Sequence, residues 1–466
     1  TKGLAKLVSN TSEQQQAPQS AISEEERQKI EAEKADKRKA RKNNGAKRDM
    51  HYEMEEEEHV VYPDDPDFDI NKARLFTTVP RICVRYECVP MRFIKHVYKI
   101  HTYTQEGRLF EGKTPASAFL NSSYDGSFIA GLMELRYIQS LPVERIINYF
   151  ESHGFTLKKP TAHKLIEKAS SLFENLYKCI RQTALSDPYK AADETYYKIL
   201  VPEKNSKGKG VRKGYLWVVV GINTRMIYLL YDDGSRSERV ILNELGSCKG
   251  IIQSDGYSPY RKLESDAYPN ITRIPCLQHI KRKFIDCGEK DPDVKRIVEL
   301  INALYQNEHK HKVGVEGWTV EQNLMHRKKY APDILGEIKD VLDEIEERGD
   351  LLPKSELQEA ITYLRNEWNA VVDIFNYGDT YLDNNMVERM NRYISLSRKN
   401  SLFFGSHKGA ERGAILYTIA LTCRMHKVNL FEYLTDVINR TAEWQPNTPI
   451  EKYRELLPDR WEKAND

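Results

Sequence analysis

The segment from Asp383 to Gly413 combines an acidic residue, adjacent amides and a basic loop that also carries aromatic side chains (DNNMVERMNRYISLSRKNSLFFGSHKGAERG). Asp383 is a suitable N-cap, and no Gly or Pro follows for a dozen residues, so a helix around Glu388 is predicted. An ion pair between Glu388 and Arg392, one turn apart, is the plainer explanation of the acid. The loop favours a functional site instead, because its composition suits binding of a phosphate backbone beside a carboxylate. The basic side chains of this segment that we expect to contact DNA are Arg392, Arg398, Lys399 and Lys408.

A single carboxylate does little chemistry at phosphorus, so other parts of the chain must supply partners. From Ala191 onward, three strand-like runs are joined by short turns and are followed by a helical piece and two more apolar runs, GIIQS and TRIPCLQHI. Short connections predict an antiparallel meander, and the crossover predicts parallel strands after it. In a ribonuclease-H-like sheet, which has this order, the middle of the first strand lies beside the end of the fourth. Asp193 opens the first run and Asp255 follows the fourth, so we expect the two side by side.

Helix-forming sequence between residues 127 and 178 contains a tight turn, HGFT, with an apolar stripe before it and a possible cap, Thr161, after it. Two helices joined in this way suit a helix-turn-helix, with Lys164 and Lys168 on the face that would meet DNA. Helix hairpins are also common in proteins that never bind DNA, so this alternative stays open.

The preceding region, from Val60 to about Thr114, alternates apolar and polar residues with the period of a strand. Cys83 and Cys88 lie here, but no second pair of cysteines or histidines stands at the spacing of zinc ligands. No zinc is therefore expected, and the cysteines are interpreted as strand residues.

Composition limits the remaining possibilities. The 71 basic and 69 acidic side chains give a formal net charge of +2, so affinity for nucleic acid must come from local patches. No apolar run is long enough to cross a bilayer, no signal peptide opens the chain, and the 7 cysteines are scattered, all of which indicate a cytoplasmic protein without a membrane partner. Residues 1–58, rich in Gln, Ser, Glu and Lys, predict a disordered charged tail, with a DNA-binding arm as the less favoured alternative.

Four blocks of residues carry a resemblance to a known family. ADET around Asp193, QSDGY around Asp255, CLQHIKRKF at 276–284 and the DNN–ER–RKN–LFFGS–KGAER series occur in one order along the chain. Together they resemble the insertion-sequence-sixty-six family of bacterial DDE transposases over roughly residues 85–440. Two family features have no counterpart here: a cysteine-rich zinc-ribbon-like segment and an N-terminal leucine-patterned coiled coil.

The resemblance implies that Asp193, Asp255 and Glu388 are the catalytic and metal-binding triad of a transposase. Such enzymes cleave and join DNA by in-line displacement at phosphorus, a reaction suited to two divalent cations. Carboxylates are the ligands of Mg²⁺ or Mn²⁺, whereas cysteine and histidine suit other metals. His279 and Lys283, just after the fifth strand-like run, are expected to contact the DNA backbone, although a structural role is an equal alternative. The implied partners are the double-stranded DNA of the element's ends and target, further copies of this chain, and accessory proteins of the element, in the bacterial nucleoid.

These predictions combine into an α/β protein with a ribonuclease-H-like mixed-sheet core, a helical insertion, and a β-rich segment and a helix-turn-helix-like domain before the core. The expected organisation is a tail (1–58), a small β-rich domain (59–115), a DNA-binding helical domain (116–187), the first part of the core (188–285), the insertion (286–370), the completion of the core (371–409) and a C-terminal helical domain (410–466).

Three functions remain compatible with these residues: a DDE transposase, a non-catalytic transposase-derived repressor, and a hydrolytic nuclease of the same fold that does not join ends. Within the transposase interpretation, Glu411 competes with Glu388 for the third carboxylate, since both precede an arginine. Glu388 is preferred because Glu411 falls near the start of the next predicted helix, where the helix dipole explains an acid.

Overall fold

The computed structural model describes residues 55–462 apart from 78, 90–91, 116, 120–121, 205–207, 209, 289, 311–312, 314–316 and 446. Most of the predicted N-terminal tail therefore lies outside the described residues. The last residues of the predicted tail are described, and Glu55–Val61 forms strand β1. The boundary expected at residue 58 between the tail and the β-rich domain is therefore wrong. None of the helices in the described part of the chain is long and apolar enough to cross a membrane.

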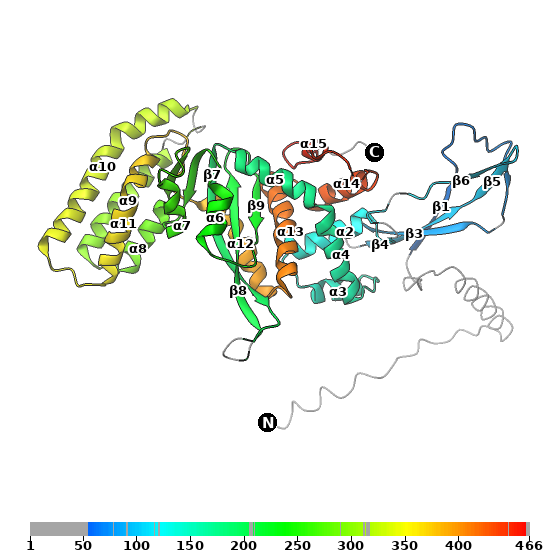
Figure 1. Ribbon diagram of the computed structural model, residues 1–466, viewed down its shortest axis with the longest axis horizontal. Helices are drawn as coiled ribbons and strands as arrows, with labels where there is room; N and C mark the ends of the chain where they lie inside the picture. Colours follow the sequence, from blue (N-terminus) through cyan, green and yellow to red (C-terminus); the bar gives the residue numbers. More distant parts are fainter. Residues whose placement is uncertain are drawn as a thin grey trace, which may run out of the picture. The chain divides into compact units, whose positions relative to one another are not determined.

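The N-terminal described region consists of two small sheets, as the alternating sequence predicts (Figure 1). One sheet has the order β1-β4-β3 and the other β2-β5-β6. β1 pairs with β4 in parallel and β4 pairs with β3 antiparallel, which leaves β1 at an edge. The remaining strands here are β2 (Arg74–Leu75), β3 (Arg81–Val89), β4 (Arg92–Ile100), β5 (Thr102–Gln105) and β6 (Arg108–Glu111).

Four helices follow: α2 (Gly126–Tyr137), α3 (Val143–Ser152), α4 (Lys159–Leu172) and α5 (Glu174–Ser186). The HGFT turn between α3 and α4 is confirmed, with Gly154 at a φ of +83° that favours glycine. Two details differ from the prediction. Pro160 starts α4 early, so Thr161 lies inside the helix and Lys158 is the N-cap. The helix-forming sequence after the turn is also divided, at Phe173, into α4 and α5.

A five-stranded mixed sheet forms the centre, in the order β11-β10-β7-β8-β9. β7 (Tyr189–Leu200), β8 (Val211–Gly221) and β9 (Ile227–Leu230) are the predicted antiparallel meander. After α6 (Glu238–Leu245), β10 (Gly250–Ser254) runs parallel to β7, and β11 (Ile271–Pro275) runs parallel to β10. The run TRIPCLQHI is only partly a strand, because Leu277–Asp286 forms helix α8.

Between α8 and the last part of the fold stand α9 (Pro292–Lys310), α10 (Val320–Arg348) and α11 (Glu356–Ile374), which are the predicted helical insertion (Figure 1). α10 continues through Pro332. α11 packs against both α8 and β11, so the insertion contacts one edge of the central sheet.

The chain then returns to the central sheet. α12 (Asn385–Asn400) packs on β7 and β8, and α13 (His407–Met425) packs on β9 and β7. Figure 1 shows both helices, in orange, against the green strands. α14 (Leu430–Ala442) lies against α2, and α15 (Ile450–Arg454) against α5. Most of the buried apolar residues form one cluster that runs from the helical region through the sheet to the insertion.

Candidate active site

Asp193 and Asp255 lie beside each other because of the register between β7 and β10. Gln253 is paired with Ala191, and the two aspartates are each two residues further along these parallel strands. Neighbouring strands are about 4.8 Å apart, so residues at matching positions are direct neighbours. Asp193 is in the middle of β7 rather than at its start, which corrects the prediction that it opens the strand.

The environment of Asp193 opposes ionisation. Burial, followed by the nearby charges of Glu194 and Asp255, raises the pKa of the Asp193 carboxyl to about 8. The carboxylate accepts hydrogen bonds from Asn391 Nδ2 at 2.6 Å and from the backbone N–H of Glu194 at 2.8 Å. These two donors favour the charged form but only partly offset burial. A cation bound here would favour the charged carboxylate.

Helix α12 is held on β7 by amide side chains as well as by apolar packing. Asn384, its N-cap, is buried and donates from Nδ2 to the carbonyl of Ala192 at 3.1 Å. Asn391, two turns later, binds Asp193, while Val387 and Ile394 are fully buried underneath. The helix was predicted to be capped by Asp383, which instead accepts from the N–H of Asn385. The apolar face is as predicted, but the role of Asn391 was not recognised in the sequence.

Glu388 lies on the same helix, three residues before Asn391, and faces α8. Its Oε1 is 3.7 Å from Nδ1 of His279, and both atoms are buried without a hydrogen-bond partner among the described residues. The i,i+4 ion pair with Arg392 is not among the ion pairs of the described chain, and Arg392 is exposed. Glu388 thus stands on the helix whose Asn391 binds Asp193. Its side chain lies against His279 of α8, the helix that follows β11.

Cys276, at the start of α8, completes a group with His279 and Glu388 whose possible ligand atoms lie within 4.8 Å of one another. The Cys276 sulfur already accepts the backbone N–H of Asn384 at 3.2 Å, and burial raises its pKa to about 12. The group thus joins the start of α12 to α8.

A pocket of about 250 Å³ opens beside Asp255. It is lined by both predicted phosphate contacts of α8, His279 and Lys283, and by residues from the loops after β9 and β10 and from α11. Its full lining is Arg236, Asp255, Gly256, Tyr257, His279, Arg282, Lys283, Asp286 and Tyr363. The basic side chains of this pocket are Arg236, His279, Arg282 and Lys283, and they lie near the Asp255 carboxylate. Such surroundings suit a phosphate group held near a metal ion.

Glu194 is a residue whose importance the sequence did not reveal. It points away from Asp193, as strand alternation predicts, but its side chain is only 4% exposed. Arg236 donates to it at 2.5 and 2.9 Å and stacks over the ring of Tyr257 at 4.1 Å. Burial and then the charge of Asp255 raise the pKa of Glu194. Arg236 could not be identified in advance, because nothing in its loop, DDGSRSER, marks it as the partner of a strand residue.

The basic residues predicted to contact DNA on and after α12 differ in how accessible they are. Arg398 is engaged by β7: its guanidinium donates to the carbonyl of Tyr196 and lies 3.8 Å from the centre of that ring. Phe404, in the loop after α12, exchanges backbone hydrogen bonds with β7 and is buried. Arg392, Lys399 and Lys408 are exposed, and so are the apolar side chains of Leu402 and Phe403.

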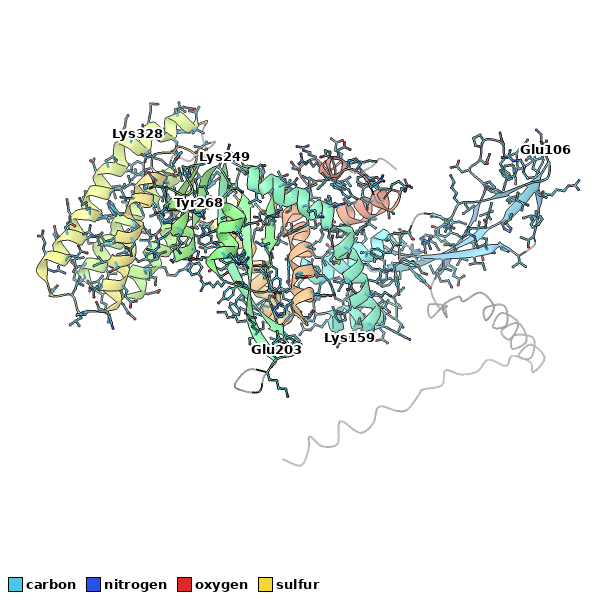
Figure 2. All side chains as sticks on the ribbon, viewed as in Figure 1. Glu106, Lys159, Glu203, Lys249, Tyr268 and Lys328 are labelled. Carbon is cyan, nitrogen blue, oxygen red and sulfur yellow. The ribbon has the colours of Figure 1, made fainter. Side chains whose placement is uncertain are left out.

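The two α4 lysines that were predicted to contact DNA also differ in exposure. Lys164 is exposed, whereas Lys168 is half-buried with its ammonium 5.3 Å from the Phe119 ring. Lys159, labelled in Figure 2 at the start of α4, pairs with Glu144 of α3. Of these three, Lys164 is the one most accessible to DNA.

The described atoms around the acidic residues suit a hard divalent cation. Glu388 Oε1, Asn384 Oδ1 and Asn391 Oδ1 are buried oxygens without hydrogen-bond partners among the described residues. A buried polar atom needs a partner, and a bound cation can supply one to each of these oxygens. All three are oxygen atoms, the type that Mg²⁺ and Mn²⁺ prefer.

Comparison with known proteins identifies the family of the chain. The model of the transposase IS66 family matches residues 121–412, more than half of the 466 residues, and the chain belongs to this family. Similar proteins include three uncharacterized proteins of Sinorhizobium fredii (strain NBRC 101917 / NGR234). Protein y4jD is 25% identical over 76% of this chain and 70% of its own length. Protein y4hP is 24% identical over 89% and 76%, and y4qI is 25% identical over 79% and 69%.

Proposed function

We propose that this chain is a DDE transposase that cleaves and joins DNA at the ends of its own insertion sequence. The observation that carries the proposal is the convergence of three separate segments at one place: Asp193 in mid-strand, Asp255 after the adjacent parallel strand, and α12 bound to Asp193 through Asn391. Family membership supports it. The order of the central sheet, with two parallel strands added beside an antiparallel meander, is the order expected of a ribonuclease-H-like core.

In this proposal the residues that would hold two Mg²⁺ or Mn²⁺ ions are Asp193, Asp255 and Glu388. Bound ions would supply activation of the attacking water or 3′ hydroxyl and stabilisation of the leaving oxygen. The protein's own groups orient the ligands: Asn391 fixes the Asp193 carboxylate, and Asn384 holds the first turn of α12 against β7. His279, Arg282 and Lys283 line the pocket beside Asp255, where they bind the phosphate backbone.

DNA binding outside this pocket is assigned to α3 and α4 as a helix-turn-helix and to the exposed basic residues that follow Glu388. Lys164 is the principal contact of α4, and Arg392, Lys399 and Lys408 contact the strand near the active site. Because each end of an element must be held, we expect several copies of the chain on DNA, together with accessory proteins of the element. In this proposal, cleavage and joining of DNA take place on the bacterial nucleoid in the cytoplasm.

The proposal is tested by incubating the full chain with a duplex that carries an end of its element and with a target plasmid. Metal-dependent cleavage of the end and its joining to the plasmid are expected, and both should disappear in chelator. A nuclease would cut without joining, and a transposase-derived repressor would bind the end without cutting. Either of these results, obtained with protein that binds the duplex specifically, would overturn the proposal.

A further inference from the structure

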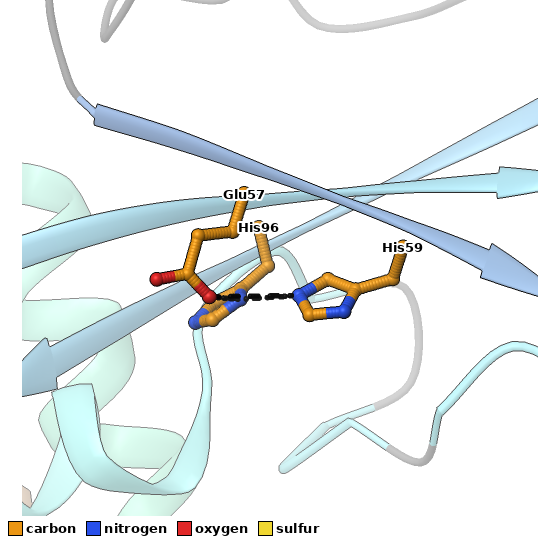
Figure 3. Close-up of side chains that lie close together, drawn as sticks. All are labelled: Glu57, His59 and His96. Carbon is orange, nitrogen blue, oxygen red and sulfur yellow. Dashed lines mark hydrogen bonds and ion pairs between the residues drawn. The ribbon is translucent and has the colours of Figure 1, made fainter.

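We propose that the small sheet β1-β4-β3 carries a zinc site formed by Glu57, His59 and His96, separate from the acidic site of the central sheet. The three side chains come from two adjacent strands and point toward one another in Figure 3. Their possible ligand atoms all lie within 4.8 Å of one another. This site replaces the expectation, based on cysteine spacing alone, that the region binds no zinc.

Strand register explains how the cluster arises. Glu57 is paired directly with His96, and His59 follows two residues later, so all three lie on one face of the sheet. The other acids of the run EEEEHV have different partners: Glu56 pairs with Lys95 and Glu58 with Lys99, on the opposite face. Charge pairing with lysine therefore accounts for Glu56 and Glu58 but not for Glu57.

The spacing of the ligand atoms suits one ion of zinc's size. His59 Nε2 is 3.1 Å from His96 Nδ1, and Glu57 Oε2 is 3.8 Å from each of these nitrogens. Zinc bonds of about 2.0–2.1 Å in tetrahedral geometry keep ligand atoms roughly 3.3 Å apart, between these two values. Distances of 3.8 Å are too long for hydrogen bonds, so Glu57 gains little from its neighbours unless an ion lies between them.

A second carboxylate prepares His96 for such a role. Glu87 of β3 lies 2.5 Å from His96 Nε2. A hydrogen bond from Nε2–H to Glu87 leaves Nδ1 unprotonated, and its lone pair faces Glu57 and His59, whose Nε2 lies 3.1 Å away. Carboxylates that orient a metal-binding histidine through its other nitrogen are usual in zinc sites. Tyr98 stacks on the His59 ring at a centroid distance of 5.2 Å and restrains it.

The surroundings leave the ion one coordination position that is open to water. Glu57 and His59 are close to half exposed, at 47% and 44%, so water can reach the fourth coordination site. Two imidazoles and a carboxylate favour zinc over the Mg²⁺ expected at the acidic site. Since β1 is an edge strand, an ion shared by β1 and β4 would fasten this edge to the sheet.

Zinc binding by the full chain provides the test. Protein treated with chelator and dialysed should bind one equivalent of Zn²⁺, measured by competition with a chromophoric chelator. His59→Gln and His96→Gln should each weaken this equivalent at least tenfold, and Glu87→Gln should weaken it about 10–100-fold. His101→Gln, which changes a histidine just after β4, is the matched control. Glu388→Gln should leave the equivalent in place, which distinguishes this site from the acidic site.

A second measurement does not depend on the variants. Zinc should slow hydrogen exchange of the β1 amides in the wild-type chain, and Co²⁺ in its place should give the intense visible absorption of a four-coordinate ion. If His96→Gln fails to fold, His59→Gln and the Co²⁺ spectrum decide the question. Absence of a tight zinc equivalent, or an equivalent unaffected by both histidine substitutions, would overturn the proposal.

Discussion

At the scale of single residues, the choice between Glu388 and Glu411 decides which carboxylate completes the candidate site. Glu388 is on the helix whose Asn391 binds Asp193, and its Oε1 is buried without a hydrogen-bond partner among the described residues. Glu411 is exposed on α13. It was expected in the first turn of a helix, but α13 starts at His407, and no acid stands in that turn.

Glu388→Gln should abolish metal-dependent cleavage and joining while specific binding of the element's end is retained, because only a metal ligand is lost. Glu411→Gln is the matched control and should change the free energy of unfolding by no more than about 0.5 kcal/mol, as exposed substitutions usually do. Cleavage and gel-shift assays on both variants measure this. An inactive Glu411→Gln together with an active Glu388→Gln would show that the acidic site is assigned wrongly.

The raised pKa of Asp193 predicts a pH-dependent stability. The folded protein keeps a proton on this carboxyl up to a pKa of about 8, whereas the unfolded chain loses it near 3.8. Between these values the folded state binds more protons, so in chelator its stability falls as pH rises. Asp193→Asn removes this loss, and its melting temperature should exceed that of the wild type by a margin that grows from pH 4 to pH 8.

Added Mg²⁺ should raise the melting temperature of the wild type at pH 8 but not that of Asp193→Asn, since the ion restores the favourable environment of the charged form. The exposed Asp340→Asn serves as the control and should follow the wild type throughout. Parallel melting curves of the wild type and Asp193→Asn across this pH range would contradict the interpretation.

At the scale of elements, the pair α3–α4 is the part of the fold assigned to DNA binding by position and composition alone. Lys164 is exposed, whereas Lys168 is held over Phe119. Lys164→Gln should reduce the slope of log affinity against log salt by about 0.9, the effect of one lost phosphate contact. Lys168→Gln should have a smaller effect. Binding titrations at several salt concentrations give the slopes.

The exposed Lys178→Gln on α5 is the control for these titrations and should leave the slope unchanged. Cleavage at high protein concentration should survive the substitution of Lys164, because the acidic site is untouched. A slope that does not change in Lys164→Gln would mean that α3 and α4 only support the fold.

At the scale of the whole molecule, the helical insertion is joined to the candidate site by a buried ion pair. Arg273 of β11 and Glu367 of α11 are both fully buried and paired, and the guanidinium also donates to the Asp255 carbonyl at 3.2 Å. Tyr363 of α11 accepts the backbone N–H of Gly256 at 2.8 Å. The insertion thus fixes the loop that carries Asp255 as well as contacting the sheet.

Glu367→Gln should lower the free energy of unfolding by about 1–3 kcal/mol, because the buried guanidinium of Arg273 loses one of its two carboxylate partners and keeps the other, Glu264. It should also weaken Mg²⁺ affinity through the Asp255 loop. Glu359→Gln, exposed on the same helix, is the control. Urea unfolding and metal titration measure both effects, and a change as small as that of the control would show that the pair does not support the site.

The amino-acid sequence alone determined the elements and their kinds. Strand alternation predicted the small β-rich region, and short connections predicted the antiparallel meander with parallel strands after it. Helical spacing predicted the helical insertion and the apolar face of α12. The structure confirms these features. These features depend on local periodicity and on which face of an element is apolar, which a sequence records directly. Asp193 and Asp255 could also be expected side by side, because the predicted order of the strands decides which residues are neighbours.

Only the tertiary structure decided the partners that come from distant segments. The bond from Asn391 to Asp193, the ion pair of Arg236 with Glu194 and the contact of Glu388 with His279 each join residues far apart in sequence. The cluster of Glu57, His59 and His96 depends on one register between β1 and β4, and a shift of a single residue would move its ligands to opposite faces. Register and side-chain partners follow from how surfaces pack, and no local pattern of residues specifies them.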